Sequence, residues 1–230
     1  SCIWCPGAGQ SGFNALGQIL SGKINPSGKT SDIFVKDLMN TPTANNYGTG
    51  DFAYDNMDDY GNKSGDTVTP VHFTNYVEGI YVGYRFWETA ANEGLVDYDA
   101  NVLYPFGYGL SYTSFSQTLD QLEAKDGTIT ATVTVTNTGD VAGKDVVQLY
   151  VNPPYTNGGI EKASANLVAF DKTDLLEPGK SQTLTLTLSE EDLASYDSEC
   201  IKSSNGAYVL ESGDYEIHLC SDSHTVLDTY

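Results

Sequence analysis

The sequence predicts a remnant of an α/β layer followed by an all-β, immunoglobulin-like sandwich, and three observations support this fold class. Residues 1–40 contain a strand, a loop and a helix in succession. Residues 76–115 begin with bulky apolar and aromatic residues interleaved with small ones and end, at 104–112, with rings that alternate with glycines, as expected of a segment that lies between two packed bodies. From residue 119 onward, apolar and polar residues alternate along short stretches, which is typical of antiparallel strands. Because 230 residues suffice for two domains, we place one at residues 1–112 and the other at residues 113–230.

The N-terminal part of the chain is interpreted as the end of an α/β domain. We expect a strand remnant at residues 2–4, a loop at 6–9 and a helix over 13–20. A Pro-Gly turn at residues 25–28 and a second strand at 33–35 should follow. The glycines of the first loop do not have the spacing of a phosphate-binding motif, so we interpret this loop as a strand-to-helix turn.

Residues 41–75 are predicted to form a long polar loop that is rich in carboxylates and amides. These positions are Asn45, Asn46, Asp51, Asp55, Asp58, Asp59, Asn62 and Asp66. Oxygen ligands of this kind suit Ca²⁺, although their spacing differs from that of an EF-hand loop. Two interpretations therefore stay open, a bound cation or a solvated acidic loop. Because so long a loop usually covers a surface or borders a site, substrate or partner contacts are best sought here.

The C-terminal part of the chain shows the pattern of a β-sandwich. Five short stretches alternate or are continuously apolar: residues 128–136, 146–151, 167–170, 184–188 and 215–219. Asn, Gly and Pro residues separate them, as expected of turns between antiparallel strands. The threonines that alternate with apolar residues are interpreted as the solvated face of the strands rather than as a sugar groove.

Two stretches carry a resemblance to a known family. Residues 78–85 read EGIYVGYR, and residues 104–112 read YPFGYGLSY. In this order they resemble the C-terminal region of glycoside hydrolase family 3, the β-glucosidase family. Residues 4–29 are similar to the end of that family's α/β-sandwich domain, although Ala8 and Phe13 stand where the family usually has proline and glycine.

The β-rich part extends this resemblance. It resembles the fibronectin type III-like domain that ends many family 3 enzymes, at residues 133–139, 143–151, 153–154 and 175–179. The resemblance therefore implies an α/β-sandwich remnant that carries an acidic loop and an aromatic, glycine-rich linker, followed by a fibronectin type III-like sandwich.

The resemblance also implies where the catalytic groups lie. Family 3 enzymes retain anomeric configuration by means of a nucleophilic Asp in an N-terminal barrel and an acid/base Glu, and both are expected upstream of Ser1. We therefore assign no catalytic, cofactor-binding or metal-binding residue in this chain. Glu78, Arg85 and Glu88 match family motifs but are assigned structural roles. Arg85 is expected to pair with a carboxylate or to pack on a ring between the domains.

The cysteines and histidines do not indicate a reactive site. The chain has Cys2, Cys5, Cys200 and Cys220, and the most plausible disulfide is Cys200 with Cys220, across neighbouring strands. Cys2 and Cys5 have C-x-x-C spacing but lack the further ligands that zinc requires. The histidines His72, His218 and His224 are scattered. Because no serine lies in a nucleophile-elbow motif, a serine triad is not supported.

Charge excludes several partners. Acidic residues outnumber basic ones 31 to 11, giving a net charge of −20, which disfavours nucleic acid and anionic lipid surfaces. No apolar run is long enough to cross a bilayer. The acidic composition and the disulfide hypothesis favour an extracellular or cell-surface location.

Two functional hypotheses remain. The first is a non-catalytic C-terminal fragment of a β-glucosidase-like hydrolase, whose partners are the rest of the parent enzyme and, in the intact enzyme, a carbohydrate substrate. The second is an independent fibronectin-like binding or adhesion module. A carbohydrate-binding module would additionally need a row of rings on an exposed face. The ring-and-glycine stretch at residues 104–112 favours the first hypothesis, because it implies a larger apolar body against which to pack.

Overall fold

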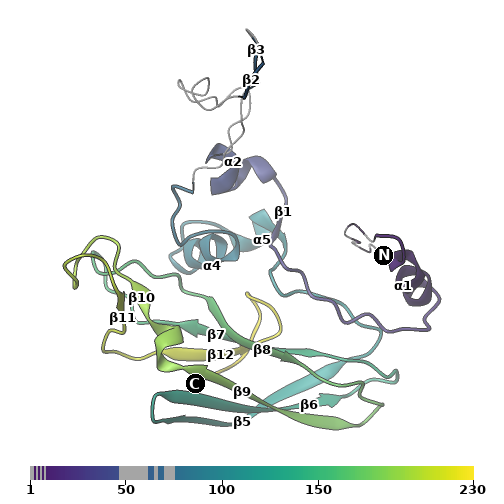
Figure 1. Ribbon diagram of the computed structural model, residues 1–230. Helices are drawn as coiled ribbons and strands as arrows, with labels where there is room; N and C mark the ends of the chain where they lie inside the picture. Colours follow the sequence, from purple (N-terminus) through teal and green to yellow (C-terminus); the bar gives the residue numbers. More distant parts are fainter. Residues whose placement is uncertain are drawn as a thin grey trace.

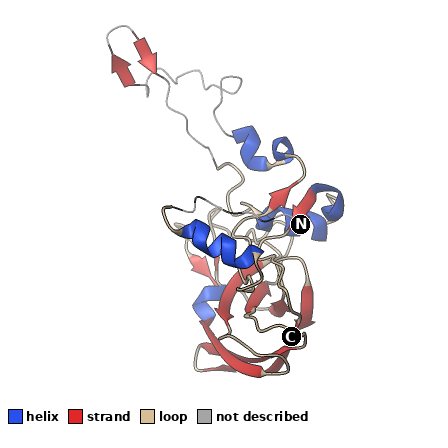
Figure 2. Cartoon of the chain, turned by 90° about the vertical axis from the view of Figure 1, so that its right-hand side faces the viewer, coloured by secondary structure: helices blue, strands red, loops and turns tan. Residues whose placement is uncertain are grey.

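The computed structural model shows a β-sandwich with short helices and an extended linker packed on one of its sheets (Figure 1). It describes residues 3, 5, 7, 9–46, 62–64, 67–69 and 76–230. In Figure 2 the strands of the two large sheets gather at one end of the molecule, and most of the helices lie beyond them. No helix in the described part of the chain combines the length and the apolar character that a membrane span requires.

Two antiparallel sheets form the sandwich. The three-stranded sheet has the order β5-β6-β9, with β5 at Phe115–Lys125, β6 at Thr128–Asn137 and β9 at Ser181–Ser189. The four-stranded sheet has the order β13-β12-β7-β8, formed by Val226–Thr229, Glu216–Cys220, Val146–Asn152 and Asn166–Lys172. All five predicted strands are therefore confirmed.

The core lies between these two sheets, on the side to which the apolar residues of each alternating stretch point. In β6 every second residue from Ile129 onward is buried, and the intervening threonines are more exposed. This confirms that the threonines form the outer face of the strand. Residues of both sheets pack into one core: Leu119, Ala131, Val133, Val135, Val147, Leu149, Leu176, Leu184, Leu186 and Leu219.

Asn137 fixes the turn after β6. Its side chain is fully buried, and its amide nitrogen donates to the carbonyls of Val141 and Leu176 at 2.9 and 2.8 Å. Its oxygen accepts from the hydroxyl of Thr113 and the backbone N–H of Gly139. This one buried amide thus forms hydrogen bonds with four polar groups. Such bonds are needed because a buried polar side chain without partners destabilises a core.

Smaller elements complete the sandwich. The 3-10 helix η2 (Glu190–Leu193) follows β9, and the side chain of Asp192 accepts from both the N–H and the hydroxyl of Ser189. This pair of contacts forms a capping box at the start of the turn. Strand β10 (Ser195–Tyr196) pairs with β11 (Tyr208–Val209) in a separate two-stranded ribbon.

The N-terminal part contains the predicted helix and second strand. Helix α1 spans Gly12–Leu20, and β1 (Phe34–Val35) pairs with β4 (Val102–Tyr104). The strand remnant expected at residues 2–4 falls mainly on residues outside the described part of the chain. Helix α1 buries no residue, and it lies apart from the other helices (Figure 1).

The acidic segment is described only in part. The 3-10 helix η1 (Leu38–Asn40) precedes it. The segment contains α2 (Pro42–Asn46) and the paired strands β2 (Asn62–Ser64) and β3 (Thr67–Thr69), so it is not a continuous loop as expected. Five carboxylates of the cation hypothesis lie outside the described residues: Asp51, Asp55, Asp58, Asp59 and Asp66. Within the described ranges, no group of three or more His, Cys, Asp or Glu side chains could hold a metal ion.

The linker, residues 76–112, joins the N-terminal part to the sandwich. It contains α4 (Tyr84–Asn92) and α5 (Tyr98–Asn101), which lie over the sheet that contains β7 and β8 (Figure 1). The hydroxyl of Thr30 donates to the carbonyl of Pro105 at 2.6 Å and accepts from the N–H of Tyr108 at 2.9 Å. The side-chain oxygen of Asn25 accepts from Ser111 and Tyr112, while its nitrogen donates across to the carbonyl of residue 142. The motifs at residues 25–29 and 104–112 therefore meet in space.

This contact can be tested at Gly109. A β-carbon there would overlap the backbone carbonyl of Gly28, whereas a β-carbon at Gly28 itself would meet nothing within 4 Å. We expect Gly109→Ala to lower the free energy of unfolding by about 1–3 kcal/mol through overpacking, and Gly28→Ala to change it little. Urea unfolding monitored by circular dichroism measures both. Equal effects of the two substitutions would show that the turn does not pack on the linker.

Candidate functional site

A cluster of three aromatic rings attaches the linker to the sandwich. The ring of Tyr84 on α4 stacks on Phe106, with centroids 4.6 Å apart, and meets the ring of Tyr150 on β7 edge to face at 6.0 Å. Tyr84 and Tyr150 are buried, and the Tyr84 hydroxyl accepts from the N–H of Leu167 on β8 at 3.0 Å. Phe106 packs with Tyr84, Tyr150 and Leu167, so this segment of the linker packs against the four-stranded sheet. Its position between two domains stays a prediction.

Arg85 lies at the same junction. Its Nε donates to Oδ1 of Asn166 on β8 at 3.1 Å, and its guanidinium carbon lies 5.2 Å from the centroid of the Tyr84 ring. Of the two roles expected for Arg85, packing on a ring is the one observed. The position of that ring between two domains stays a prediction. Such stacking keeps the charge partly in contact with water while the stem covers apolar surface.

A buried carboxylate forms a second contact between linker and sandwich. Glu88 on α4 accepts from the hydroxyls of Tyr98 and Ser223 through Oε1, at 2.8 and 2.7 Å. Its Oε2 lies 2.9 Å from Nδ1 of His224. The rings of Tyr98 and His224 stack face to face with centroids 3.6 Å apart. The loop after β12 is thereby fastened to α4 and α5.

The environment of Glu88 opposes its charge. Burial raises the pKa of the Glu88 carboxyl above its ordinary value, although the hydrogen bonds from His224, Ser223 and Tyr98 act in the opposite direction. Burial and the neighbouring Glu88 charge also raise the pKa of Tyr98. Because both carboxylate oxygens already have partners, this group is suited to holding the junction together rather than to proton transfer.

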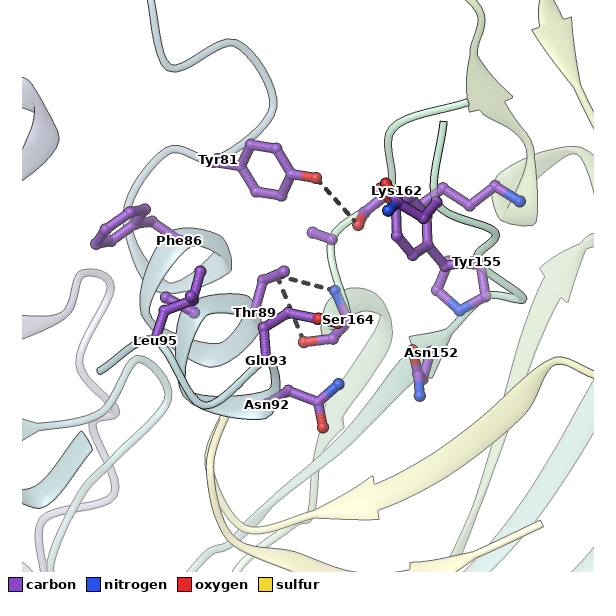
Figure 3. A pocket seen from close by; sticks show the side chains of 14 residues that line it. Tyr81, Phe86, Thr89, Asn92, Glu93, Leu95, Asn152, Tyr155, Lys162 and Ser164 are labelled. Carbon is purple, nitrogen blue, oxygen red and sulfur yellow. Dashed lines mark hydrogen bonds between the residues drawn. The ribbon is translucent and has the colours of Figure 1, made fainter. Parts of the chain in front are cut away.

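A pocket of about 400 Å³ lies beside this junction, between α4 and the connection from β7 to β8. Figure 3 shows Tyr81 and Phe86 on one side of the pocket, and Tyr155 and Lys162 on the opposite side. Its other lining residues are Thr89, Ala90, Asn92, Glu93, Leu95, Asn152, Pro153, Asn157, Ala163 and Ser164. We call this pocket the α4 groove.

Specific polar contacts hold the walls of the α4 groove. The hydroxyl of Tyr81 donates to Oε2 of Glu161 at 2.5 Å. The N–H of Ser164 donates to the hydroxyl of Thr89 at 3.0 Å (Figure 3). The ammonium of Lys162, which is buried, donates to the carbonyl of residue 154 and forms an ion pair of 2.6 Å with Glu211. The groove is therefore preformed.

The carboxylates of the α4 groove do not have the setting of a glycosidase pair. A glycosidase acid must keep its proton near neutral pH, which requires a desolvated carboxyl beside a second, ionised one. Glu93 lines the groove and Glu161 borders it, but both side chains are exposed to water. The buried Glu88 is not part of the lining. The catalytic Asp and Glu expected upstream of Ser1 stay a prediction.

The cysteines and histidines differ in part from expectation. Cys200 and Cys220 are both free thiols, so the predicted disulfide is wrong. Cys200 is exposed on a loop, whereas Cys220 is buried among the rings of the junction, and burial raises its pKa to about 12. His218 lies 3.4 Å from Glu216 on its own strand, and His72 lies outside the described residues.

Replacement of Phe106 tests the ring stack. Because the ring is only partly buried, we expect Phe106→Ala to lower the free energy of unfolding by about 2–3 kcal/mol, somewhat less than a fully buried ring would. The matched control is Phe170→Ala on β8, where the ring is 69 % exposed and the expected change is below about 0.5 kcal/mol. If urea unfolding showed similar losses of unfolding free energy for both variants, the packing of Phe106 against the sheet would be contradicted.

The Glu88 carboxyl can be tested by its pH dependence. A raised pKa means that the neutral form favours folding, so this stabilisation is complete below the ordinary pKa of 4.5 and is lost as pH rises through the folded-state value. Glu88→Gln, which cannot ionise, should therefore become progressively more stable than the unmodified chain as pH rises above this range. Glu88→Ala should instead cost about 2–4 kcal/mol at neutral pH, because Tyr98, Ser223 and His224 lose their acceptor.

The control for this measurement is Glu177→Gln, which replaces an exposed carboxylate. The difference in stability between this variant and the unmodified chain should not grow with pH as it does for Glu88→Gln. Thermal unfolding at a series of pH values gives both profiles, and a pH-independent Glu88→Gln difference would contradict a raised pKa.

Comparisons with known proteins place the chain in a family. Residues 145–223 match the fibronectin type III-like domain family. β-Glucosidase A of Butyrivibrio fibrisolvens is 39 % identical over 226 residues, which cover 92 % of this chain and 24 % of the relative. The β-glucosidase structure from Paenibacillus barengoltzii has a TM-score of 0.77 at 35 % identity and covers 95 % of this chain and 21 % of its own. The GH3 β-glucosidase of Bifidobacterium adolescentis has a TM-score of 0.71 at 28 % identity, covering 96 % and 28 %.

These matches extend over nearly the whole of this chain, so they include the linker and the N-terminal part as well as the sandwich. The chain spans about a quarter of the length of the relatives that it matches. It therefore belongs to the β-glucosidase family, glycoside hydrolase family 3, and corresponds to a portion of that family's length that includes a fibronectin type III-like domain.

Proposed function

We propose that this chain is the non-catalytic C-terminal part of a β-glucosidase-like glycoside hydrolase, which in its intact form hydrolyses O-glycosyl bonds with retention of configuration. The observation that carries the proposal is the pattern of coverage: relatives match 92 % or more of this chain but only about a quarter of their own length. The catalytic Asp and Glu then belong to the remaining part of the enzyme.

Exposed apolar side chains support a large partner for the N-terminal part. Phe13 and Leu20 on α1 are 68 % and 66 % exposed. Further exposed apolar residues lie elsewhere in residues 1–112: Leu38, Met39, Val77, Leu103 and Leu110. Large apolar side chains that stay exposed in this number favour a surface that a partner covers. The rest of the enzyme, its barrel and the start of its α/β domain, is the partner that we propose for this surface.

The β1–β4 ribbon supports the same partner. In the described part of the chain it is a two-stranded sheet, and such a ribbon is marginally stable by itself. In a larger α/β layer, further strands would extend this sheet. We propose that residues 1–112 complete this layer and that residues 113–230 form a separate sandwich domain.

The sandwich then acts as a support for the catalytic part. Its four-stranded sheet holds the linker through the rings of Tyr84, Phe106 and Tyr150 and through the buried Glu88. The linker in turn holds the turn at residues 25–29. An independent adhesion module would have no use for these contacts, so this alternative is the less favoured one.

Activity measurements test the proposed function. We expect the isolated chain to release no nitrophenol from p-nitrophenyl β-D-glucoside above the rate without protein, whereas the intact enzyme should be active. If the chain alone were active, Glu93→Gln and Glu161→Gln would show whether the α4 groove was responsible. Turnover that either variant abolished would overturn the assignment of this chain as non-catalytic.

A further inference from the structure

We propose that the α4 groove is a non-catalytic binding site for a neutral carbohydrate, one or two pyranose units at the end of a short oligosaccharide. This inference goes beyond the proposed function, because the groove needs none of the catalytic groups expected elsewhere in the enzyme. Its walls come from two separate parts of the chain, α4 with Tyr81 and the connection between β7 and β8.

The size and aromatic lining of the groove suit a sugar ring. Its volume of about 400 Å³ lies within the range of small-molecule sites, about 300–1,000 Å³. Tyr81, Phe86 and Tyr155 supply aromatic surface from both sides (Figure 3). Tyr155 is 44 % exposed, so its ring remains accessible to a ligand. A pyranose has C–H groups on its faces that can pack on such rings, while its hydroxyls point outward at the edges.

Polar side chains lie where those hydroxyls would be. Asn92, Glu93, Asn152 and Asn157 line the groove, and Figure 3 shows the first three along one end of it. A side-chain amide both donates and accepts, and a carboxylate accepts from two hydroxyls at once. This mixture matches the alternating donors and acceptors of a sugar. It disfavours a purely apolar ligand, which would desolvate these groups without replacing their hydrogen bonds.

Charge selects a neutral ligand. Glu93 and Glu161 lie at the groove, and Lys162 does not offset them because Glu211 already pairs with its ammonium at 2.6 Å. The net charge of −20 adds a repulsive field for anions. Glucuronate-containing or sulfated oligosaccharides should therefore bind more weakly than neutral ones of the same length.

Hydrogen bonds and an ion pair also hold the walls of the groove. The Tyr81–Glu161, Ser164–Thr89 and Lys162–Glu211 contacts fix both walls. A site whose side chains are already ordered loses less conformational entropy on binding. These contacts distinguish the groove from exposed tyrosines elsewhere, such as Tyr208, which is 75 % exposed and meets the ring of the exposed Tyr196 edge to face.

Binding of cellotetraose to the full chain tests the proposal. Isothermal titration calorimetry at neutral pH measures the affinity, and NMR or fluorescence competition with glucose reports whether a short ligand suffices. We expect Tyr155→Ala to weaken binding at least tenfold, on the order of the loss of one stacked ring. Tyr155→Phe, which keeps the ring, should bind within a factor of about three. Asn92→Ala should also weaken binding.

The matched control is Tyr208→Ala, an exposed tyrosine on the β10–β11 ribbon, which should leave the affinity unchanged. Circular dichroism of each variant checks that the fold is retained. Failure of the unmodified chain to bind cellotetraose, or equal losses in Tyr155→Ala and Tyr208→Ala, would overturn the proposal. So would tighter binding of an anionic oligosaccharide.

Retention of the intact enzyme on an insoluble glucan provides a second readout. Tyr155→Ala should reduce retention while leaving hydrolysis of p-nitrophenyl β-D-glucoside unchanged. Unchanged retention would mean that the rest of the enzyme covers the groove, and this too would overturn the proposal. Because hydrolysis and retention are measured separately, a failure of the sugar site is distinguishable from a failure of the proposed function.

Discussion

The arrangement of this chain depends on the fact that strand β7 is buried on both faces. Val147, Leu149 and Val151 point into the core between the sheets, whereas Tyr150 packs against the linker rings. The amide of Gln148, on the same side as Tyr150, donates to the carbonyl of Gly107 at 3.1 Å. A strand that is covered on one side only would alternate in character. The continuous run VVQLYV at residues 146–151 therefore already contains the requirement for a second packed layer.

Glu88 adds specificity to this packing. Apolar rings can slide against one another at little cost, but a buried carboxylate is tolerated only where all its partners are in place. Its partners Ser223 and His224 belong to the loop after β12, so α4 can dock in one position only. The stacked Tyr98 ring fixes the orientation of His224. The apolar contacts supply the stabilisation, and the hydrogen-bonded cluster around Glu88 determines the position in which α4 docks.

Local patterns predict the strands and turns of this chain well, because each strand in the sandwich repeats a simple inside–outside alternation. The sequence pattern alone predicts that the threonines of β6 face outward and that the chain turns at Asn137. The Glu88 cluster could not be predicted, because two of its three partners lie 135 and 136 residues away along the chain. The only signal was the match of Glu88 to the family, and such a match does not reveal its partners.

The groove and the cysteines show the same limit of local reasoning. The groove forms where two segments of no particular pattern meet, and no periodicity marks either of them as a wall. Cys200 and Cys220 share a β-rich region, which suggested a bond. However, Cys220 lies under the junction rings, and Cys200 lies on an exposed loop with a φ of 56°. Membership of one region does not bring two thiols to bonding distance, because the direction of each Cβ also matters.

The two parts of the chain differ in whether they bury their own apolar side chains. The sandwich encloses its own core, whereas α1 buries none of its residues and has only nine of them. A helix this short gains too little from its own hydrogen bonds to be stable in water, and it needs an apolar surface to pack on. The contacts at Asn25 and Thr30 fix only the segment after the helix. Within the described residues, the linker reaches α1 through the hydroxyl of Tyr112, which donates to the carbonyl of Ile19 at 2.9 Å. We therefore propose that the remaining surface for α1 comes from the rest of the enzyme, with the sandwich holding the linker in position to meet it.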